Sequence, residues 1–297
     1  KIKKGKFNFQ SINFIKNNLF KEKMQFHIRK TPITPLIISI PHAGSYYPKE
    51  FLKYKSIDIK KLKIMEDFKT DTFIDKINLN LADIFIAECS RAVIDLNRSR
   101  QSLDESMFNS KIKTTPHEEV LLIKSGLGVI PSKCYTEEIF KSKLPNFYIS
   151  KMLEKYYDPF HKKLSKRINY LKSKFGVVYL IDIHSTPTLS NNNKNFPDVI
   201  IGDNFGKSSE ENFKNDLINH FKNLDLRLSI NSPYSGGYIT RRYGEKDKNV
   251  NVIQLEISKN YYMNENTFEL KNNINNIKNI FKSIVEKFNV KTSIAAE

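Results

Sequence analysis

Apolar positions along the chain form short runs separated by longer mixed segments, and this pattern predicts an alternation of strands and helices. Apolar runs predict strands at 36–40, 84–89, 92–96, 177–183 and 198–202, and the run at 177–183 is nearly continuous, as is typical of a strand buried on both faces. The segment 251–257 mixes apolar residues with Asn251, Gln254 and Glu256 and is also predicted to be a strand. The segments between them are expected to be helical over 71–85, 150–174, 207–222 and 265–288. Strands that alternate with helices over the full length indicate one α/β domain.

The ends of the chain differ from this pattern. Residues 1–30 are rich in Lys, Asn and Phe without a clear period, so we expect an irregular or partly helical lead-in. The domain is then expected to span 31–290, followed by a tail at 291–297. Within it, polar composition and Pro116 predict a long surface loop over 99–118.

Nothing in the sequence suggests a membrane or export segment. The apolar stretch 176–183 is much shorter than the ~20 residues of a bilayer span. Asn, Gln and Lys interrupt 7–20, so the basic N-terminus lacks the apolar core of a signal peptide. Cys89 and Cys134 are too few for a disulfide scaffold and lack CxxC spacing. We therefore expect a cytoplasmic, enzyme-sized protein that does not associate with a membrane.

The net charge of +17 raises the question of nucleic-acid binding. Lys accounts for 41 and Arg for only 8 of the 49 basic residues, and the lysines are spread over the whole chain. Scattered lysines favour solubility rather than a specific function, so no nucleic-acid partner is expected. The arginines carry more information, because five of the eight lie in the two stretches 91–100 and 241–242.

Polar residues follow or end four of the apolar runs. They are His42, Asn97 with Arg98, Asp182 with His184, and Gln254 with Glu256. Ligands of open α/β sheets bind at the carboxyl ends of strands, so these four sets are expected to converge on one site. Two histidines, a carboxylate and an arginine are what a metal hydrolase acting on an anionic substrate needs.

Each of these residues also has a structural interpretation. A single histidine after a strand can simply cap a turn, and Glu256 can form a structural salt bridge instead of acting as a general base. His184 favours the role of ligand, because burying it together with Asp182 at a strand end is costly unless both are paired or bound. His161 lies on the apolar stripe of its helix and is expected to be a core histidine.

Six short motifs in order along the chain resemble the N-formylglutamate amidohydrolase family. They are PHAG, SRxVIDLNR, DxHS, GGYITRxYG, QLE and YMNE, and the resemblance extends from Pro35 to Glu265. That family is related to zinc carboxypeptidase-like hydrolases, whose phosphorylase/hydrolase-like fold has a mixed, eight-stranded sheet flanked by helices. The resemblance thus implies a single-domain α/β fold with a mixed central sheet, one Zn²⁺ per chain and hydrolysis of an amide bond.

The resemblance also implies roles for individual residues. His42 and His184 correspond to zinc ligands, Arg98 with Asn97 to a clamp for the substrate carboxylate, and Glu256 to the general base. Arg91 or Arg241 is expected to stabilise the developing oxyanion.

A glycine turn completes the expected pocket. Gly236 and Gly237 allow the chain to turn tightly before Arg241 and Arg242. Gly237 and Arg242 are therefore expected at the substrate-binding rim.

The third metal ligand departs from the carboxypeptidase pattern. Those enzymes place a glutamate three residues after the first histidine, where this chain has Ser45. Asp67 matches an acidic position of the family and is the expected ligand, since catalytic zinc usually takes three protein ligands. Glu66 is its rival, and both can also be ordinary acids of a first helical turn.

The implied substrate is N-formylglutamate, which would be cleaved to formate and glutamate. The segment 185–203 departs from the pattern of dedicated N-formylglutamate deformylases, so an amidase or carboxypeptidase-like deacylase acting on another N-acyl amino acid or peptide is the alternative. In either case the partner is a small anionic N-acyl amino acid. Two other classes remain, a basic nucleic-acid-binding protein and a metal-free protein that uses the fold for binding.

Overall fold

The computed structural model describes residues 24–74, 80–109, 119–188, 196–222, 224 and 226–294, with side chains as far as 288. Within these residues a seven-stranded sheet has the order β1-β3-β2-β6-β9-β7-β8. The strands are β1 (Gln25–His27), β2 (Leu36–Ile40), β3 (Asp83–Ile86), β6 (Val178–Thr186), β7 (Val199–Gly202), β8 (Leu228–Ile230) and β9 (Val250–Ser258). A separate two-stranded ladder pairs β4 (Lys133–Cys134) with β5 (Glu137–Glu138).

The sheet is mixed, as expected. Strands β3, β2, β6 and β9 are parallel neighbours, and β7 pairs parallel with β8. Strand β1 runs antiparallel to β3, and β7 runs antiparallel to β9. The predicted single-domain α/β fold with a mixed central sheet and flanking helices is therefore confirmed, with seven strands among the described residues where the resemblance implies eight.

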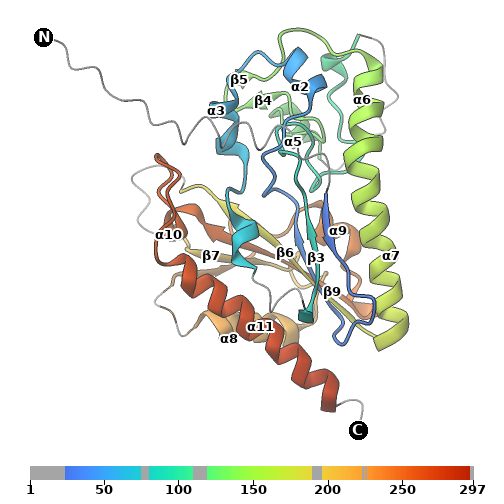
Figure 1. Ribbon diagram of the computed structural model, residues 1–297, viewed down its shortest axis with the longest axis vertical. Helices are drawn as coiled ribbons and strands as arrows, with labels where there is room; N and C mark the ends of the chain where they lie inside the picture. The colour runs from blue at the N-terminus through green and yellow to red at the C-terminus, as the bar shows by residue number, and fades with distance from the viewer. Residues whose placement is uncertain are drawn as a thin grey trace, which may run out of the picture.

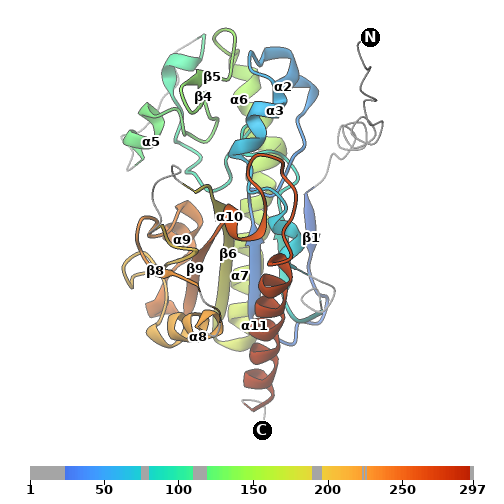
Figure 2. The same cartoon turned by 90° about the vertical axis from the view of Figure 1, so that its left-hand side faces the viewer.

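Helices cover both faces of the sheet (Figures 1 and 2). The longer helices are α6 (Asn146–Met152), which continues through one wide π turn (Leu153–Tyr157) into α7 (Asp158–Phe175), α8 (Glu211–Phe221) and α11 (Ile274–Ile294). Apolar residues of α7 pack on one face of the sheet, and those of α8 and α11 pack on the other.

Shorter elements gather mostly at one end of the molecule (Figure 2). The short α-helices are α2 (Lys49–Tyr54), α3 (Ile59–Leu62), α5 (Val120–Lys124), α9 (Tyr238–Tyr243) and α10 (Lys259–Tyr262). The 3-10 turns are η1 (Lys63–Met65), η2 (Thr70–Phe73), η3 (Glu105–Met107) and η5 (Lys246–Lys248). No helix of the described residues is both long and apolar enough to cross a membrane.

Most predicted elements are confirmed with shifted ends. The strands predicted at 36–40, 177–183, 198–202 and 251–257 are β2, β6, β7 and β9, and the helix predicted at 150–174 is the continuous α6–α7. The helix predicted at 207–222 begins at Glu211, and that predicted at 265–288 begins only at Ile274.

Two predictions were wrong in part. The segment 92–96 is a buried turn and not a strand, because the amides of Val93 and Ile94 bond back to the carbonyl of Ser90. Its apolar run therefore reflects burial and not strand pairing. The helix predicted at 71–85 is a short 3-10 turn at its start, is helical at 80–81 and is strand β3 at its end, and 75–79 lie outside the described residues. So do 1–23 of the predicted lead-in and 110–118 of the predicted loop.

Candidate active site

The face of β6 and β9 that carries α7 changes from apolar to polar partway along the strands. Leu180 and Val252 belong to the core on this face. The next residues on the same face are Asp182 and His184 in β6, which lie opposite Gln254 and Glu256 in β9. All four are buried. The alternation of the two strands thus places four polar side chains side by side beyond the end of the apolar core.

Asp67 joins the two histidines at this point. His184 Nδ1 lies 3.0 Å and His42 Nδ1 lies 3.4 Å from Asp67 Oδ2. Ligand atoms of all three residues lie within 4.8 Å of one another, and all three side chains are buried. The structure therefore brings together His42, Asp67 and His184, which come from three separate parts of the chain.

The Nε2 atom of each histidine lies within hydrogen-bonding distance of a further carboxylate. His42 Nε2 lies 2.7 Å from Asp95 Oδ1, and His184 Nε2 lies 2.9 Å from Asp182 Oδ2. A ring nitrogen that donates its proton to a carboxylate leaves the other ring nitrogen with a free lone pair. Both Nδ1 atoms then present lone pairs towards Asp67.

This donor set fits a divalent metal ion. Two imidazole lone pairs and a carboxylate converge in a buried space, where they repel one another unless a cation lies between them. The Nδ1 atom of His42 is buried without a hydrogen bond. Two imidazoles and one carboxylate are a common ligand set of catalytic zinc.

Glu66, the rival ligand, lies elsewhere. Its side chain accepts a hydrogen bond from the hydroxyl of Tyr47. Burial raises the pKa of Glu66 to about 7. The group of convergent ligand atoms contains Asp67 and not Glu66.

Glu256 is buried beside this group. It lies opposite His184 in the register of β6 and β9, and its Oε1 accepts a hydrogen bond of 2.7 Å from Gln254 Nε2. Burial raises the pKa of Glu256 to about 7. A carboxylate with a pKa near neutrality can both accept and return a proton, which is what a general base needs.

Three arginines line the same pocket as the histidines. Arg91 Nη2 donates to Asp95 Oδ2 at 2.8 Å, and Arg241 Nη2 donates to Glu119 Oε1 at 2.6 Å. Arg98 donates through Nε to the carbonyl of Leu127 and through Nη1 to the carbonyl of Asn97. The arginines are therefore held in place at a polar wall of the pocket.

Arg242 lies apart from these arginines. Its Nη1 donates to the Tyr238 hydroxyl at 2.8 Å, and its guanidinium lies over the rings of Tyr238 and Tyr243. It does not belong to the residues that line the pocket. The structure thus separates Arg242 from Arg91, Arg98 and Arg241.

Asn97 and Gly237 are in close contact at the start of α9. Asn97 Oδ1 accepts the amide of Ile239 at 2.7 Å, and its Nδ2 donates to Gln254 Oε1 at 3.3 Å. A Cβ atom on Gly237 would lie 2.1 Å from Asn97 Nδ2, so only glycine fits there. Gly237 therefore allows α9 to pack directly on Asn97.

The pocket around these residues has a volume of about 690 Å³. One part of its lining is polar and includes most of the residues described above. Another part is apolar and consists of Ile64, Met65, Leu122, Leu127, Tyr135, Pro187, Pro233 and Tyr234. The volume lies near the middle of the ~300–1,000 Å³ range of small-molecule sites.

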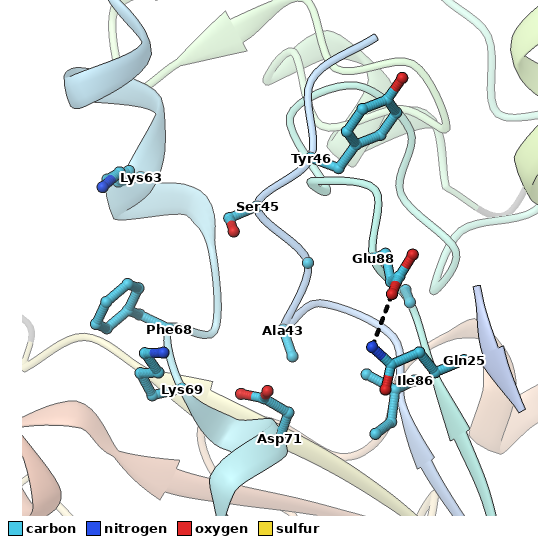
Figure 3. Close-up of a pocket in the computed structure, with 12 residues that line it drawn as sticks. Gln25, Ala43, Ser45, Tyr46, Lys63, Phe68, Lys69, Asp71, Ile86 and Glu88 are labelled. Carbon is cyan, nitrogen blue, oxygen red and sulfur yellow. Dashed lines mark hydrogen bonds between the residues drawn. The ribbon is translucent and has the colours of Figure 1, made fainter. Parts of the chain in front are cut away.

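The segment that follows His42 lines a second cavity, which has a volume of about 290 Å³ (Figure 3). Ser45 lines this cavity and not the one with the histidines. Figure 3 shows Ser45 between Lys63 and Ala43, and a hydrogen bond from Gln25 to Glu88 at one side of the cavity. The position that carries a glutamate in carboxypeptidases is therefore not part of the group formed by His42, Asp67 and His184.

Two residues of the site were not expected from the sequence. Asp95 lies in the apolar run 92–96, where a core residue is expected. Only its place in the motif DLNR distinguishes it from the other residues of that run. Lys259 lines the pocket but is one of 41 lysines, so nothing in the sequence distinguishes it. Each of the two residues contacts a partner that is distant in the sequence, and a local sequence pattern cannot predict such a contact.

Known proteins resemble this chain over most of its length. N-formylglutamate deformylase of Pseudomonas putida is 27% identical over 246 residues, which cover 78% of this chain and 82% of that protein. The enzyme of the same name from Pseudomonas aeruginosa is 26% identical over 250 residues, with 78% and 83% covered.

Solved structures share the fold. The crystal structure of N-formylglutamate amidohydrolase from Ralstonia eutropha superposes with a TM-score of 0.83 at 20% identity, covering 93% of this chain and 100% of that one. A protein of Agrobacterium tumefaciens superposes with a TM-score of 0.64 at 16% identity, with 90% and 95% covered.

A family model decides the membership. The model described as N-formylglutamate amidohydrolase matches residues 34–263, which is most of the chain and includes all the pocket residues discussed above. The chain is a hydrolase that acts on an amide bond, and it belongs to the N-formylglutamate amidohydrolase family.

Proposed function

We propose that this protein is a zinc-dependent amidohydrolase that cleaves N-formylglutamate to formate and glutamate. The observation that carries the proposal is the buried convergence of His42 Nδ1, Asp67 and His184 Nδ1, with a carboxylate on the far nitrogen of each ring. The names of the Pseudomonas relatives support the substrate.

The proposed metal site uses three ligands of this chain. His42, Asp67 and His184 would hold one Zn²⁺, which supplies Lewis acidity towards a carbonyl group and towards water. Asp95 and Asp182 orient the two imidazoles so that their lone pairs face the ion.

Glu256 is the proposed proton carrier. Its carboxylate accepts a proton from the attacking water and returns it to the leaving nitrogen, a role that its pKa near 7 supports. Gln254 holds the carboxylate in place through Oε1. Arg91 and Arg241 supply positive charge near the carbonyl oxygen as it becomes negative.

The substrate carboxylates are proposed to bind along the arginine wall. Arg98 has its Nε and Nη1 held by carbonyl oxygens, so Nη2 is the nitrogen through which it would reach a carboxylate. Asn97 shapes this wall mainly by fixing α9, because its carbonyl oxygen already accepts the Ile239 amide. Gly237 permits the same contact. Arg242 is assigned no contact with the substrate.

The direct test is turnover of N-formylglutamate by the zinc-loaded protein, followed as release of formate and glutamate in equal amounts. N-formylglutamine and N-formylaspartate serve as comparisons, because they change the charge or the length of the side chain but keep the formyl group. Turnover of N-formylglutamate with the highest kcat/KM of the three supports the proposal. Zinc-loaded protein that releases no formate from any of them contradicts it.

The apolar lining of the pocket favours a second candidate, a deacylase for larger N-acyl amino acids. Ile64 and Tyr135 are 40% and 67% exposed, and both line the pocket, so apolar surface is open to a ligand. A formyl group is too small to cover it. Comparing N-formyl-, N-acetyl- and N-hexanoylglutamate separates the candidates, since kcat/KM rises with the acyl chain only if the apolar lining binds it.

A further inference from the structure

Lys259 presents an unusual buried cation next to the proposed metal site. It is the first residue of α10, three positions after Glu256, and only 5% of it is exposed. Its Nζ donates to the carbonyl of Glu66 at 2.6 Å and to the carbonyl of Ile64 at 3.1 Å. The amine thus bonds the segment that directly precedes Asp67.

The bond to Glu66 acts on the peptide unit that carries Asp67. The carbonyl of Glu66 and the amide of Asp67 belong to one planar peptide group. The amide donates to the carbonyl of His42 at 2.9 Å, while the carbonyl accepts from Lys259 at 2.6 Å. This peptide group is therefore held at both ends. Its amide is bonded to His42, which is another proposed ligand, and its carbonyl is bonded to Lys259, which directly follows the strand that contains Glu256.

The carbonyls that Lys259 bonds lie where a helix ends. Residues 63–65 form a single 3-10 turn, and the carbonyl groups at the end of such a turn lack partners within it. An apolar side chain at 259 could fill the space but could not satisfy these oxygens. A charged amine forms stronger hydrogen bonds to them than a neutral donor does.

The charge itself is costly to bury, so its position needs a compensating interaction. Burial lowers the pKa of the Lys259 amine, and the Asp67 carboxylate acts in the opposite direction. The cation and the carboxylate therefore favour one another across the peptide group that joins them.

We propose that Lys259 is a positioning residue for the metal site, which fixes the peptide group of Asp67 so that its carboxylate meets the two histidines. The inference rests on the proposed metal site and extends it to a residue outside the ligand set. Removal of the amine should weaken zinc binding while the fold remains.

The test compares zinc affinities of the purified, metal-depleted full chain and its variants by competition with a chromophoric chelator. Lys259→Met should raise the zinc dissociation constant about 10–100-fold, as expected for loss of a group that orients a metal ligand. Denaturant unfolding of the metal-free proteins is measured in parallel, so that a loss of affinity can be separated from a loss of fold.

Lys174→Met is the matched control. Lys174 also donates its amine to a backbone carbonyl, that of Pro32, at 2.9 Å, but it lies in the last turn of α7. Its removal deletes the same kind of bond away from the pocket, so the zinc dissociation constant should not change.

The outcomes separate this inference from the proposed function. Lys259→Met protein that is folded and binds zinc as tightly as the unmodified chain overturns the role of Lys259 alone. An unmodified chain that binds no zinc overturns both. Zinc binding without turnover of N-formylglutamate contradicts the substrate and leaves the role of Lys259 standing.

A second variant covers a failure of Lys259→Met to fold. Lys259→Gln keeps a polar end but is one bond shorter and uncharged, so it cannot reach both carbonyls. It should weaken zinc binding in the same direction, and unchanged affinity in this variant also overturns the proposal.

Discussion

Glu256 is the residue whose removal should separate metal binding from chemistry. Replacing it by Gln keeps the side-chain shape and an oxygen that can accept from Gln254 Nε2. Because the amide cannot accept the proton, kcat for N-formylglutamate should fall at least ~100-fold. Zinc content and the midpoint of thermal unfolding should stay close to those of the unmodified protein.

The opposite result for Glu256→Gln would contradict its role as general base. Turnover within a few fold of the unmodified enzyme would show that Glu256 is structural. The base would then have to be another group in the pocket.

Arg98 tests whether the pocket recognises a carboxylate. Lys at this position keeps the charge but loses the planar fork and the bonds to the carbonyls of Leu127 and Asn97. Arg98→Lys should lower kcat/KM for N-formylglutamate more than for an analogue whose carboxylates are amides. Zinc content should be unchanged. Equal losses for both substrates would contradict a role in binding the carboxylate.

At the scale of elements, the contact between α9 and Asn97 depends on the absence of a side chain. In Gly237→Ala the new Cβ would lie 2.1 Å from Asn97 Nδ2, so α9 or Asn97 must move. Because Arg241 lies in α9, activity should fall along with the thermal midpoint.

Gly176→Ala provides the control for this variant. Gly176 ends α7 with a φ of 73°, and nothing lies within 4 Å of an added Cβ. It should lose stability through backbone strain and keep its activity. Equal activity of Gly237→Ala and the unmodified enzyme would show that the contact between α9 and Asn97 does not shape the site.

The elements that the sequence predicts best are those whose environment is the same along most of their length. Strands β6 and β9 are buried almost throughout; the nearly continuous apolar run at 177–183 identifies β6, and apolar residues that alternate with Gln254 and Glu256 identify β9. The run at 92–96 is buried in the same way, but the Ser90 carbonyl turns the chain back and the Val129 carbonyl binds the amide of Asp95. Burial alone therefore cannot distinguish a strand from a buried turn.

In the candidate site, too, some features can be predicted from the sequence and others cannot. Period-2 alternation within a strand is enough to place Asp182 on the same face as His184, and Gln254 on the same face as Glu256. The contacts of His42 with Asp95 and of Lys259 with Glu66 join residues 53 and 193 positions apart. Such pairings are set by tertiary packing, so no local pattern of residues predicts them.

The stability of the whole molecule should depend on pH through His161. His161 Nδ1 lies 2.9 Å from the Tyr243 hydroxyl and its Nε2 lies 3.0 Å from the carbonyl of Leu96. Burial lowers the pKa of His161 from 6.5 to about 3. Between these values the unfolded chain binds the proton and the folded one does not, so the free energy of unfolding should decrease as the pH falls from 6.5 to 3.

Denaturant unfolding of His161→Gln over this range measures the contribution. The variant should be less stable than the unmodified protein at neutral pH, and the difference should shrink as the pH falls towards the lowered pKa of His161. A difference that is constant over the whole range would show that His161 is not the group that titrates.

The number of zinc ions bound per chain is the most direct test of the proposed site formed by His42, Asp67 and His184. Metal-depleted protein is titrated with zinc, and bound metal is measured for the unmodified chain and for His184→Ala. We expect one zinc ion per unmodified chain and the loss of most of it in the variant, because a site with three protein ligands binds zinc much more weakly when one of them is removed. A chain that takes up no zinc, cobalt or manganese, or a His184→Ala variant that binds zinc as well as the unmodified chain, would contradict it.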